Sequence, residues 1–393
     1  MRVFALFGLL FMSVFSGCEV EDQPQHCEPK FNPTHAPLNV CHSDQRVSVT
    51  FVGDILLHTQ LQKQGFEEGF DSLWGSVSPF FFEADIAVAN LEGPVATGVS
   101  KTGKVIEDPG PVFDDWVYSS YPMFNYHVSL LEALKDSSID LVSTANNHSL
   151  DRFSIGVDKT IDALDEAGIS YTGTIKRGDQ RTFSTIVPTA IGSIAFLSCT
   201  FSTNGIEDRY GQVLMCYENR QELLEEVADL ASDPDVHGVI VLAHWGREYE
   251  NQPAAKDVAL AEDLARAGAT AVVGTHPHVI QPWSMVAENR GVIPIIYSTG
   301  NFVSGQPSLQ RETSMIARIE LCRGQTPASE FDSDNSPLIV SDAGWIAARM
   351  KADTNRSLRV ALSSRRDPFA QESHDLIEQL VPNFSLNPTL RCR

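Results

Sequence analysis

The chain has 393 residues, of which 42% are hydrophobic and 20% are charged, and this composition is typical of a folded globular protein. Its 51 acidic residues outnumber 29 Lys and Arg, which gives a net charge of −22. So acidic a chain is not expected to bind nucleic acid, and an anionic substrate would have to be held by a few local cations or by metal ions. The length suffices for one large α/β domain or for two smaller ones.

The N-terminal segment has the features of a secretory signal. Arg2 precedes an apolar run, 3–15, that is short for a membrane span, and a Ser-Gly pair leads directly to Cys18. We therefore predict a signal peptide over 1–18 with a lipoprotein-type Cys18, which would anchor an exported protein at the cell envelope. An ordinary signal peptide or an uncleaved anchor is the alternative.

Residues 19–45 are rich in Pro, Glu, Gln and His, and we expect a polar linker there. Beyond Cys18 the chain holds an even number of cysteines, which favours disulfides in an exported protein. Other connectivities stay open, but the simplest pairing joins neighbours along the chain. It joins Cys27 to Cys41, Cys199 to Cys216, and Cys322 to Cys392.

From residue 46 onward, short apolar runs alternate with longer amphipathic stretches. This alternation predicts an α/β fold with a largely parallel sheet covered on both faces. Strands are predicted at 47–52, 85–90, 139–145, 193–199, 237–244, 270–275 and 292–298. Helices are predicted at 127–136, 155–167, 219–231 and 254–267.

Polar clusters follow six of these strands, at the strand ends where such sheets collect their ligands. Asp, Glu, Asn and neutral His are ligands that Zn, Mn and Fe accept, whereas no nucleophile elbow and no Gly-rich phosphate loop is present in the sequence. The pattern therefore favours a hydrolytic metal centre, and "THPH" is its sharpest motif. The candidate ligands are Asp54, Glu92, Asn147, His244, His276 and His278.

The motifs "GD", "NLE", "ANNH" with a following Asp, "HWGREY", "GTHPHVIQP" and "STGNF" resemble, in order, those of the CapA family of capsule or poly-γ-glutamate synthesis proteins. The resemblance implies the calcineurin-like metallophosphoesterase fold, a four-layer α/β sandwich with mixed, largely parallel central sheets between helices. It places this domain at 46–305. Residues 306–393 are predicted to add C-terminal strands, near 313–321 and 344–350, and a tail packed on the same domain.

Carried over to this sequence, the resemblance implies two divalent ions, Mn, Zn or Fe, held by the six candidate ligands with Glu92 as the bridging carboxylate. His148 would be the proton donor to the leaving group or would stabilise the developing charge. Asp151 would either orient His148 or cap the helix that follows it. Leu56 stands where the wider superfamily has a His, and Glu92 replaces the usual Asp, so one metal site is expected to differ from ordinary phosphoesterases.

Four further residues are predicted to bind substrate: Asn90, Arg247, Glu248 and Asn301. A solvated surface position suits Arg247 equally well. The long loop at 98–116 is expected to cover the site.

The function that the resemblance implies is the synthesis, anchoring or processing of an envelope polymer such as poly-γ-glutamate, with capsule-synthesis membrane proteins as partners. Two alternatives stay open. One is a phosphoesterase acting on a small phosphate ester, and the other is a polymer-binding module without turnover.

Overall fold

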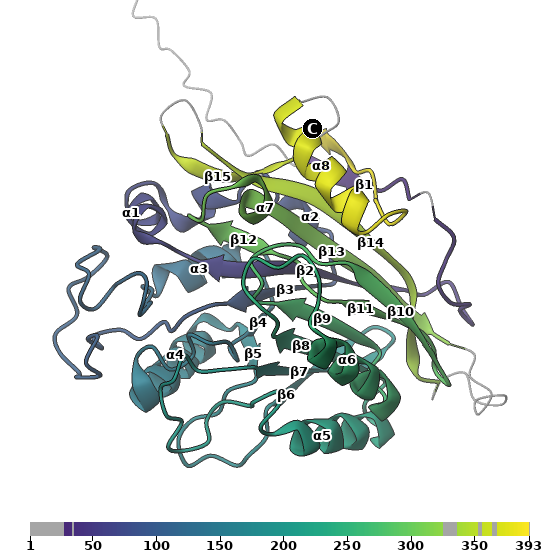
Figure 1. Ribbon diagram of the computed structural model, residues 1–393, viewed down its shortest axis with the longest axis horizontal. Helices are drawn as coiled ribbons and strands as arrows, with labels where there is room; N and C mark the ends of the chain where they lie inside the picture. The colour runs from purple at the N-terminus through teal and green to yellow at the C-terminus, as the bar shows by residue number, and fades with distance from the viewer. Residues whose placement is uncertain (1–26, 34, 325–335, 353–355, 364–367, 393) are drawn as a thin grey trace, which may run out of the picture.

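The computed structural model describes residues 27–33, 35–324, 336–352, 356–363 and 368–392 (Figure 1). Two stacked β-sheets form its centre. In spatial order the larger sheet contains β15 (Leu358–Leu362), β14 (Leu338–Ala352), β13 (Thr313–Arg323), β2 (Val47–Leu56), β3 (Ile86–Leu91), β4 (Leu141–Ser143) and β5 (Ser170–Thr172), with β12 (Asn301–Ser304) beside β2. The smaller sheet contains β10 (Trp283–Glu288), β11 (Gly291–Ile296), β9 (Ala271–Thr275), β8 (Gly238–His244), β7 (Gly192–Thr200) and β6 (Ser184–Thr189).

The larger sheet is parallel from β2 to β5 and antiparallel from β2 to β15, and the smaller sheet is parallel at its centre with an antiparallel strand at each edge. Strands β2 to β5 run parallel to one another, as do β7, β8, β9 and β11. Every residue of β2, β3, β8 and β9 is buried, as expected for strands that are covered on both faces. All seven predicted strands are present, which confirms this part of the prediction.

Helices cover the outer face of each sheet. Against the larger sheet pack α1 (Thr59–Glu68), the 3-10 helix η1 (Phe70–Leu73), α2 (Pro79–Phe82), α3 (Ser129–Asp136) and α4 (Phe153–Ala167). Against the smaller sheet pack α5 (Arg220–Ser232) and α6 (Ala255–Ala267). The four predicted helices correspond to α3, α4, α5 and α6. Helices α4 and α6 each end at a glycine in the left-handed conformation, Gly168 at φ 65° and Gly268 at φ 117°.

The hydrophobic core lies in three layers between these elements. One layer, with Trp74 and Phe302, fills the space between the helices and the larger sheet. A second, with Phe51 and Phe196, joins the two sheets, and a third lies under α5 and α6. The layers are therefore helix, sheet, sheet and helix, which confirms the predicted four-layer α/β sandwich.

The C-terminal part of the chain belongs to the larger sheet. β13 pairs antiparallel with β2 and with β14, and β14 pairs with β15. The short helix α7 (Leu309–Glu312) precedes β13, and α8 (Pro368–Leu380) packs on β14. Most of the segment between β13 and β14 lies outside the described residues.

The segment before β2 is held against the domain, which corrects the predicted linker from Cys27 onward. β1 (Cys27–Lys30) pairs with β16 (Thr389–Cys392), and the Asn39 side chain donates hydrogen bonds to the carbonyls of Val292 and Val340 at 2.9 and 2.8 Å. Its polar composition misled the prediction, because backbone pairing, a few specific hydrogen bonds and the packing of Phe31 and Leu38 on the core hold the segment in place. Residues 1–26, including the predicted signal and Cys18, lie outside the described residues.

The disulfides agree only in part with the neighbour pairing. Cys199 is bonded to Cys216, as predicted, whereas Cys41 is bonded to Cys322. The predicted pairs Cys27–Cys41 and Cys322–Cys392 are therefore wrong. β13 brings Cys322 next to the N-terminal segment, where Cys41 forms a backbone bridge with Gly324. Cys27 is also disulfide-bonded, and its partner in the strand ladder is Cys392. Within the described ranges, no helix has the length and apolar character needed to cross a membrane.

Candidate metal centre

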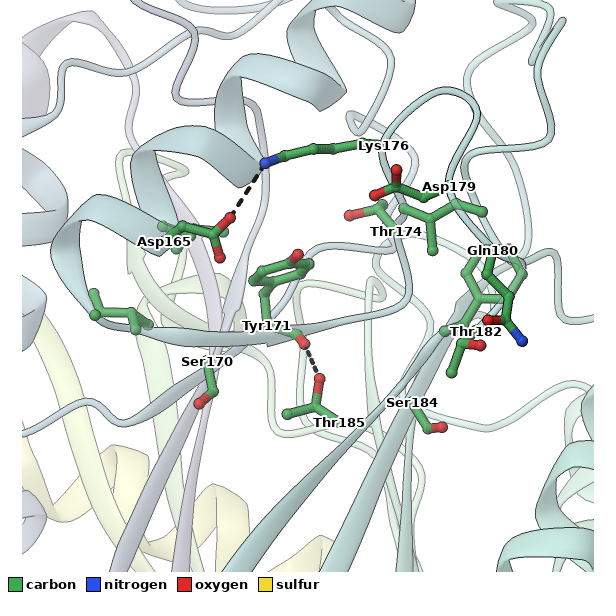
Figure 2. Close-up of a pocket in the computed structure, with 15 residues that line it drawn as sticks. Asp165, Ser170, Tyr171, Thr174, Lys176, Asp179, Gln180, Thr182, Ser184 and Thr185 are labelled. Atoms are coloured by element: carbon green, nitrogen blue, oxygen red, sulfur yellow. Dashed lines mark hydrogen bonds and ion pairs between the residues drawn. The ribbon is translucent and has the colours of Figure 1, made fainter.

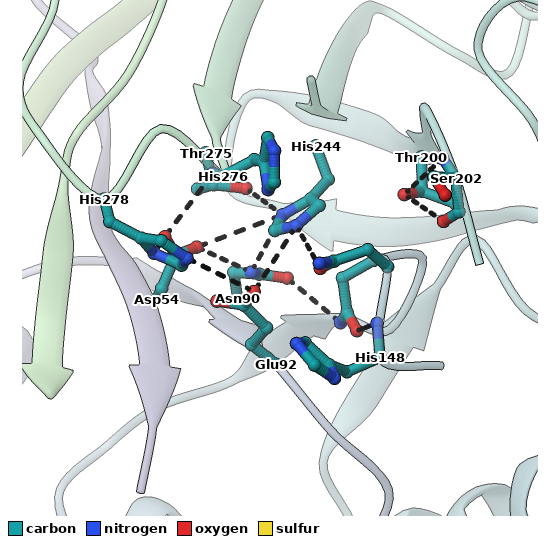
Figure 3. Close-up of polar contacts among 12 residues, drawn as sticks. Asp54, Asn90, Glu92, His148, Thr200, Ser202, His244, Thr275, His276 and His278 are labelled. Atoms are coloured by element: carbon teal, nitrogen blue, oxygen red, sulfur yellow. Dashed lines mark hydrogen bonds and ion pairs between the residues drawn. The ribbon is translucent and has the colours of Figure 1, made fainter. Parts of the chain in front are cut away.

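Side chains of metal-ligating types converge where parallel strands of both sheets end (Figure 3). The carboxyl ends of these strands meet at one edge of the sandwich, so residues that are distant in sequence become neighbours. All six candidate ligands are buried. They are Asp54, Glu92 and Asn147 from the larger sheet and His244, His276 and His278 from the smaller sheet.

Two groups of three side chains can each offer ligand atoms to one ion. One group is Glu92, His244 and His276, and the other is Asp54, Glu92 and His278, with ligand atoms within 4.8 Å of one another in each. A Glu92 carboxylate oxygen lies 3.6 Å from His244 Nε2 and 3.9 Å from His278 Nε2. Glu92 belongs to both groups, so its carboxylate lies where an ion in either group would contact it.

The carboxylate of Glu92 is unsatisfied by the protein. Glu92 is 0% exposed, and neither of its side-chain oxygens has a hydrogen-bond partner among the described residues. The buried Nδ1 of His276 has no partner either. Leaving a buried polar atom without a hydrogen-bond partner costs about 1–3 kcal/mol, and a divalent cation bound by these atoms would remove that cost. The donor set of carboxylate, imidazole and amide oxygen fits Zn, Mn or Fe.

The electrostatics of the cluster also suit a cation. Burial, followed by the charge of Asp54, raises the pKa of Glu92 well above its usual value. Burial, followed by neighbouring histidines, lowers the pKa of both His244 and His276 well below the usual value. Both imidazoles are therefore neutral at physiological pH, which is the form that binds metals.

Hydrogen bonds set the orientation of the imidazoles. His278 Nδ1 lies 3.0 Å from Asp54 Oδ2 and 3.0 Å from Asn301 Oδ1, and since both oxygens are acceptors, Nδ1 carries the proton and Nε2 is left free in the neutral ring. Nδ1 of His244 contacts the Thr275 hydroxyl at 2.9 Å, while its Nε2 lies 2.9 Å from Asn147 Oδ1. Such partners fix the tautomer of a ligating histidine.

The backbone of "THPH" is bent in an uncommon way. His276 has φ 97° and His278 has φ 57°, both in the left-handed region that residues other than glycine rarely adopt. With this backbone the rings of the two histidines lie 5.8 Å apart, and each histidine belongs to a ligand group that contains Glu92. Strained backbone of this kind is concentrated at functional sites.

His148 lies beside the six candidate ligands and is held from two sides. Its Nδ1 is 2.7 Å from Asp151 Oδ2, and its ring meets the Phe124 ring edge-on at 4.8 Å. Asp151 also accepts a hydrogen bond from the Phe124 backbone N–H at 2.6 Å. The N-cap position of α4 is Arg152, and no side chain caps it. The geometry thus places Asp151 as a partner of His148 and not as a helix cap.

Amide side chains connect the loops of the centre. Asn90 Nδ2 donates to Asp54 Oδ1 at 2.8 Å. Asn146 donates to the Leu91 carbonyl at 2.7 Å, and its own side-chain oxygen accepts the His148 backbone N–H. These bonds join the ends of β2, β3 and β4, so the ligand-bearing loops hold one another in place.

Of the remaining predicted substrate residues, Asn301 and Glu248 lie in or near the metal centre and Arg247 lies at the surface. Asn301 lies in the centre, bonded to His278. Glu248 lies on the loop after β8, close enough to Glu92 and Tyr249 for its charge to raise the pKa of both groups, after burial in each case. Arg247 instead has a side chain that is 71% exposed and forms an ion pair with Glu250 at 3.7 Å, so the structure places it at the solvated surface.

Four residues around the ligands were not predicted from sequence, namely Phe201, Thr275, Lys256 and Arg311. Phe201 has its ring 4.2 Å from that of His276. Tyr249, which lies in the "HWGREY" motif, has its ring 6.1 Å from that of His278. Thr275 orients His244, while Lys256 and Arg311 lie over the aromatic rings. Phe201 follows β7, so the rule that located the other strand-end clusters would also have located it.

The profile of the family described as "Bacterial capsule synthesis protein PGA_cap" matches residues 48–306. The chain belongs to this family. The match spans every candidate ligand and stops within the loop after β12, so β13 to β16 lie beyond it. The CapA resemblance of the sequence motifs is thereby confirmed.

Similar proteins carry names from capsule and polymer synthesis. A capsule biosynthesis protein CapA from Bacillus anthracis is 28% identical over 301 residues, which cover 73% of this chain and 67% of that protein. A PGA biosynthesis protein CapA from Bacillus subtilis (strain 168) is 26% identical, with 85% of this chain and 82% of that protein covered.

Two solved structures are similar over most of the chain but with low TM-scores. A hypothetical protein from Thermus thermophilus has a TM-score of 0.41 and 14% identity, covering 77% of this chain and 98% of its own. The NAD nucleotidase NadN of Haemophilus influenzae has a TM-score of 0.44 and 8% identity, covering 86% of this chain and 63% of its own. Neither protein's activity is transferred to this chain.

Proposed function

We propose that this chain is an exported, metal-dependent protein that acts in the synthesis, anchoring or processing of an envelope polymer such as poly-γ-glutamate. The observation that carries the proposal is the buried Glu92 carboxylate, which is shared by two ligand groups and lacks any hydrogen-bond partner among the described residues. The names of the two CapA relatives supply the polymer class.

Two divalent ions would be held by the six candidate ligands, and when bound they supply polarisation of the group attacked and an activated water. His148 is the proposed proton donor to the leaving group. Its Nδ1 is held by Asp151, so Nε2 is the atom that would deliver the proton. Asp151 would stabilise the charged imidazole, and Phe124 would limit the movement of the ring.

The disulfides Cys41–Cys322 and Cys199–Cys216 support export, since disulfides generally form and persist in oxidising compartments. The "SGC" motif supports a lipid anchor at Cys18. Metabolic labelling with radioactive palmitate should mark the wild type and not Cys18→Ser, and labelling of both would exclude this anchor.

The catalytic proposal is tested with His148→Gln. Purified protein loaded with Mn²⁺, Zn²⁺ or Fe²⁺ is assayed against γ-linked glutamate oligomers and, separately, a small phosphate diester, and its metal content is measured by elemental analysis. The variant should keep its metal and lose hydrolysis by about 100-fold or more. His237→Gln is the control, because His237 precedes β8 at the end opposite to His244.

Three outcomes would contradict the proposal. Loss of metal from His148→Gln would make His148 a ligand. Full activity of that variant would exclude it as the proton donor. Turnover of the phosphate diester alone would replace the polymer with a phosphate ester as the substrate.

A further inference from the structure

Lys256 and Arg311 lie near the metal centre and form no ion pair with a carboxylate among the described residues. The guanidinium of Arg311 lies 4.9 Å from the centroid of the Tyr249 ring. The ammonium of Lys256 lies 4.1 Å from the Tyr217 ring and 6.0 Å from the Phe201 ring. An aromatic face holds a cation in place without neutralising it, so both charges stay available to a ligand.

Several other cations of this acidic chain form ion pairs with carboxylates. Figure 2 shows a cavity of about 490 Å³ beside β5 and β6, in which the amino group of Lys176 points toward Asp165. Lys176 lies 2.9 Å from an Asp162 oxygen and 3.2 Å from an Asp165 oxygen. That lysine is neutralised by the protein, which distinguishes it from Lys256 and Arg311.

The two free cations flank different halves of the metal centre. Lys256 lies over Phe201, whose ring contacts His276, and its charge contributes to the lowered pKa of His276 after burial and two nearby histidines. On the other side, the Arg311 backbone carbonyl accepts a hydrogen bond from Asn301, the residue that contacts His278.

The two halves of the metal centre are the ligand group with His276 and the ligand group with His278. His276 and His278 belong to different ligand groups. In Figure 3, His278 lies at one end of the cluster, and Thr200 and Ser202, the chain neighbours of Phe201, lie at the other.

We propose that Lys256 and Arg311 are two anion-binding positions on opposite sides of the metal centre, which together select a chain substrate with repeated carboxylates. The proposal rests on the proposed function and names its substrate class. Because the two cations lie over rings that contact different histidines, we expect one small anion to contact only one of them. A γ-linked glutamate chain carries one free carboxylate per residue, so it can place one on each side of the bond held between them.

Electrostatics give these two positions a large effect. A protein with net charge −22 repels an anionic chain. The carboxylates of such a chain therefore have to be bound by local unneutralised cations or by metal ions. A carboxylate that pairs with Arg or Lys forms charge-assisted hydrogen bonds, which are stronger than neutral ones. Loss of one such contact should weaken binding about tenfold.

The test is calorimetric titration of the metal-loaded protein with a ten-residue γ-linked glutamate oligomer. Lys256→Ala and Arg311→Ala should each weaken binding about tenfold, and the double variant about 100-fold, with metal content unchanged. Arg266→Ala is the matched control, since Arg266 lies on the same helix as Lys256 but is 61% exposed and paired with Asp263. It should change binding less than twofold.

Glu248→Gln provides a test with the opposite sign. Glu248 shares the Tyr249 side chain with Arg311 and repels a carboxylate at that position. Its neutralisation should strengthen oligomer binding about twofold. The same titrations with a γ-linked isoglutamine oligomer, in which a carboxamide replaces each free α-carboxylate along the chain, should show no dependence on Lys256 or Arg311.

Several results would overturn the inference. If the wild type binds and cleaves the oligomer while both cation variants bind it normally, the inference fails and the proposed function stands. If tripolyphosphate binds more tightly than the oligomer with the same dependence on both cations, the polycarboxylate assignment fails. If the wild type binds no oligomer, the inference fails together with the polymer part of the proposed function.

Discussion

The carboxylate of Glu92 lies among His244, His276 and His278 with no hydrogen-bond donor for either oxygen within the described structure. Burial and the nearby Asp54 raise its pKa well above the usual 4.5. An unfolded Glu releases its proton near that usual value. Above it, and up to the raised pKa, the folded metal-free protein holds a proton that the unfolded chain has lost, so this residue makes stability fall as pH rises.

We therefore predict that metal-free Glu92→Gln gains stability relative to the metal-free wild type as pH is raised from about 5 to about 8. Urea denaturation of both proteins at several pH values measures the difference, which also cancels the opposite contributions of His244 and His276. Glu67→Gln, an exposed position on α1, should show no such trend. Saturating metal should stabilise the wild type by mass action and leave Glu92→Gln unchanged. A constant difference across pH would refute the account.

At this scale the sequence predicted the residues that come directly after strands. Apolar runs precede Asp54, Glu92, His148 and His276. The strand-end rule predicts that these four residues lie close together. Lys256 and Arg311 come from a helix terminus and a short helix remote in sequence. Lys and Arg are common surface residues, so only the packing of Tyr249 and Phe201 distinguishes them.

Hydrogen bonds from Arg152, the residue that precedes α4, hold the loop after Glu92 in place. The Arg152 side chain is 0% exposed and donates to the carbonyls of Val99 at 3.1 Å and Val117 at 3.0 Å and to the hydroxyl of Ser119. It also follows Asp151, the partner of His148. The long loop and the proton-donor pair are thus positioned by one buried guanidinium.

Arg152→Met should cost about 2–4 kcal/mol of unfolding free energy, because several carbonyls would lose a charged donor inside the protein. The loop at 98–122 should also become sensitive to proteases, which limited proteolysis with mass spectrometry would show. Arg177→Met is the comparison, since Arg177 is 49% exposed and contacts Asp158 at 3.7 Å. Equal stability of the two variants would contradict a fastening role.

Elements with strong apolar patterns were predicted, and those that depend on context were missed. β2, β8 and β9 read as continuous apolar runs because both of their faces are covered. β10 is a half-buried edge strand, and α1 has His58 at its N-cap position, forms no side-chain cap hydrogen bond there and contains Gly65. Such segments form because neighbouring elements supply pairing partners, which local sequence does not record.

For the whole molecule, the disulfides differ greatly in the length of chain that they close. Cys41–Cys322 spans 281 positions and Cys199–Cys216 spans 17. In the chain-entropy account, the longer closure restricts the unfolded state more.

Cys41→Ser with Cys322→Ser should therefore lose about 5 kcal/mol of stability, and Cys199→Ser with Cys216→Ser about 3 kcal/mol. Urea denaturation without reductant would measure both losses against the wild type. Equal losses would indicate that the native contacts of each disulfide matter more than the closed length. Neighbour pairing failed for Cys41 and Cys322, because β13 pairs with β2 and brings Cys322 next to the N-terminal segment.

The candidate ligands divide between the two sheets, with Asp54 and Glu92 on one and the three histidines on the other. A bound ion would therefore link the two sheets of the sandwich. The spacing of its ligands would depend on how the inner faces of the two sheets pack against each other. Truncations between the two sheets, such as Phe196→Ala or Ile240→Ala, are then expected to alter metal affinity from a distance, through the relative position of the sheets.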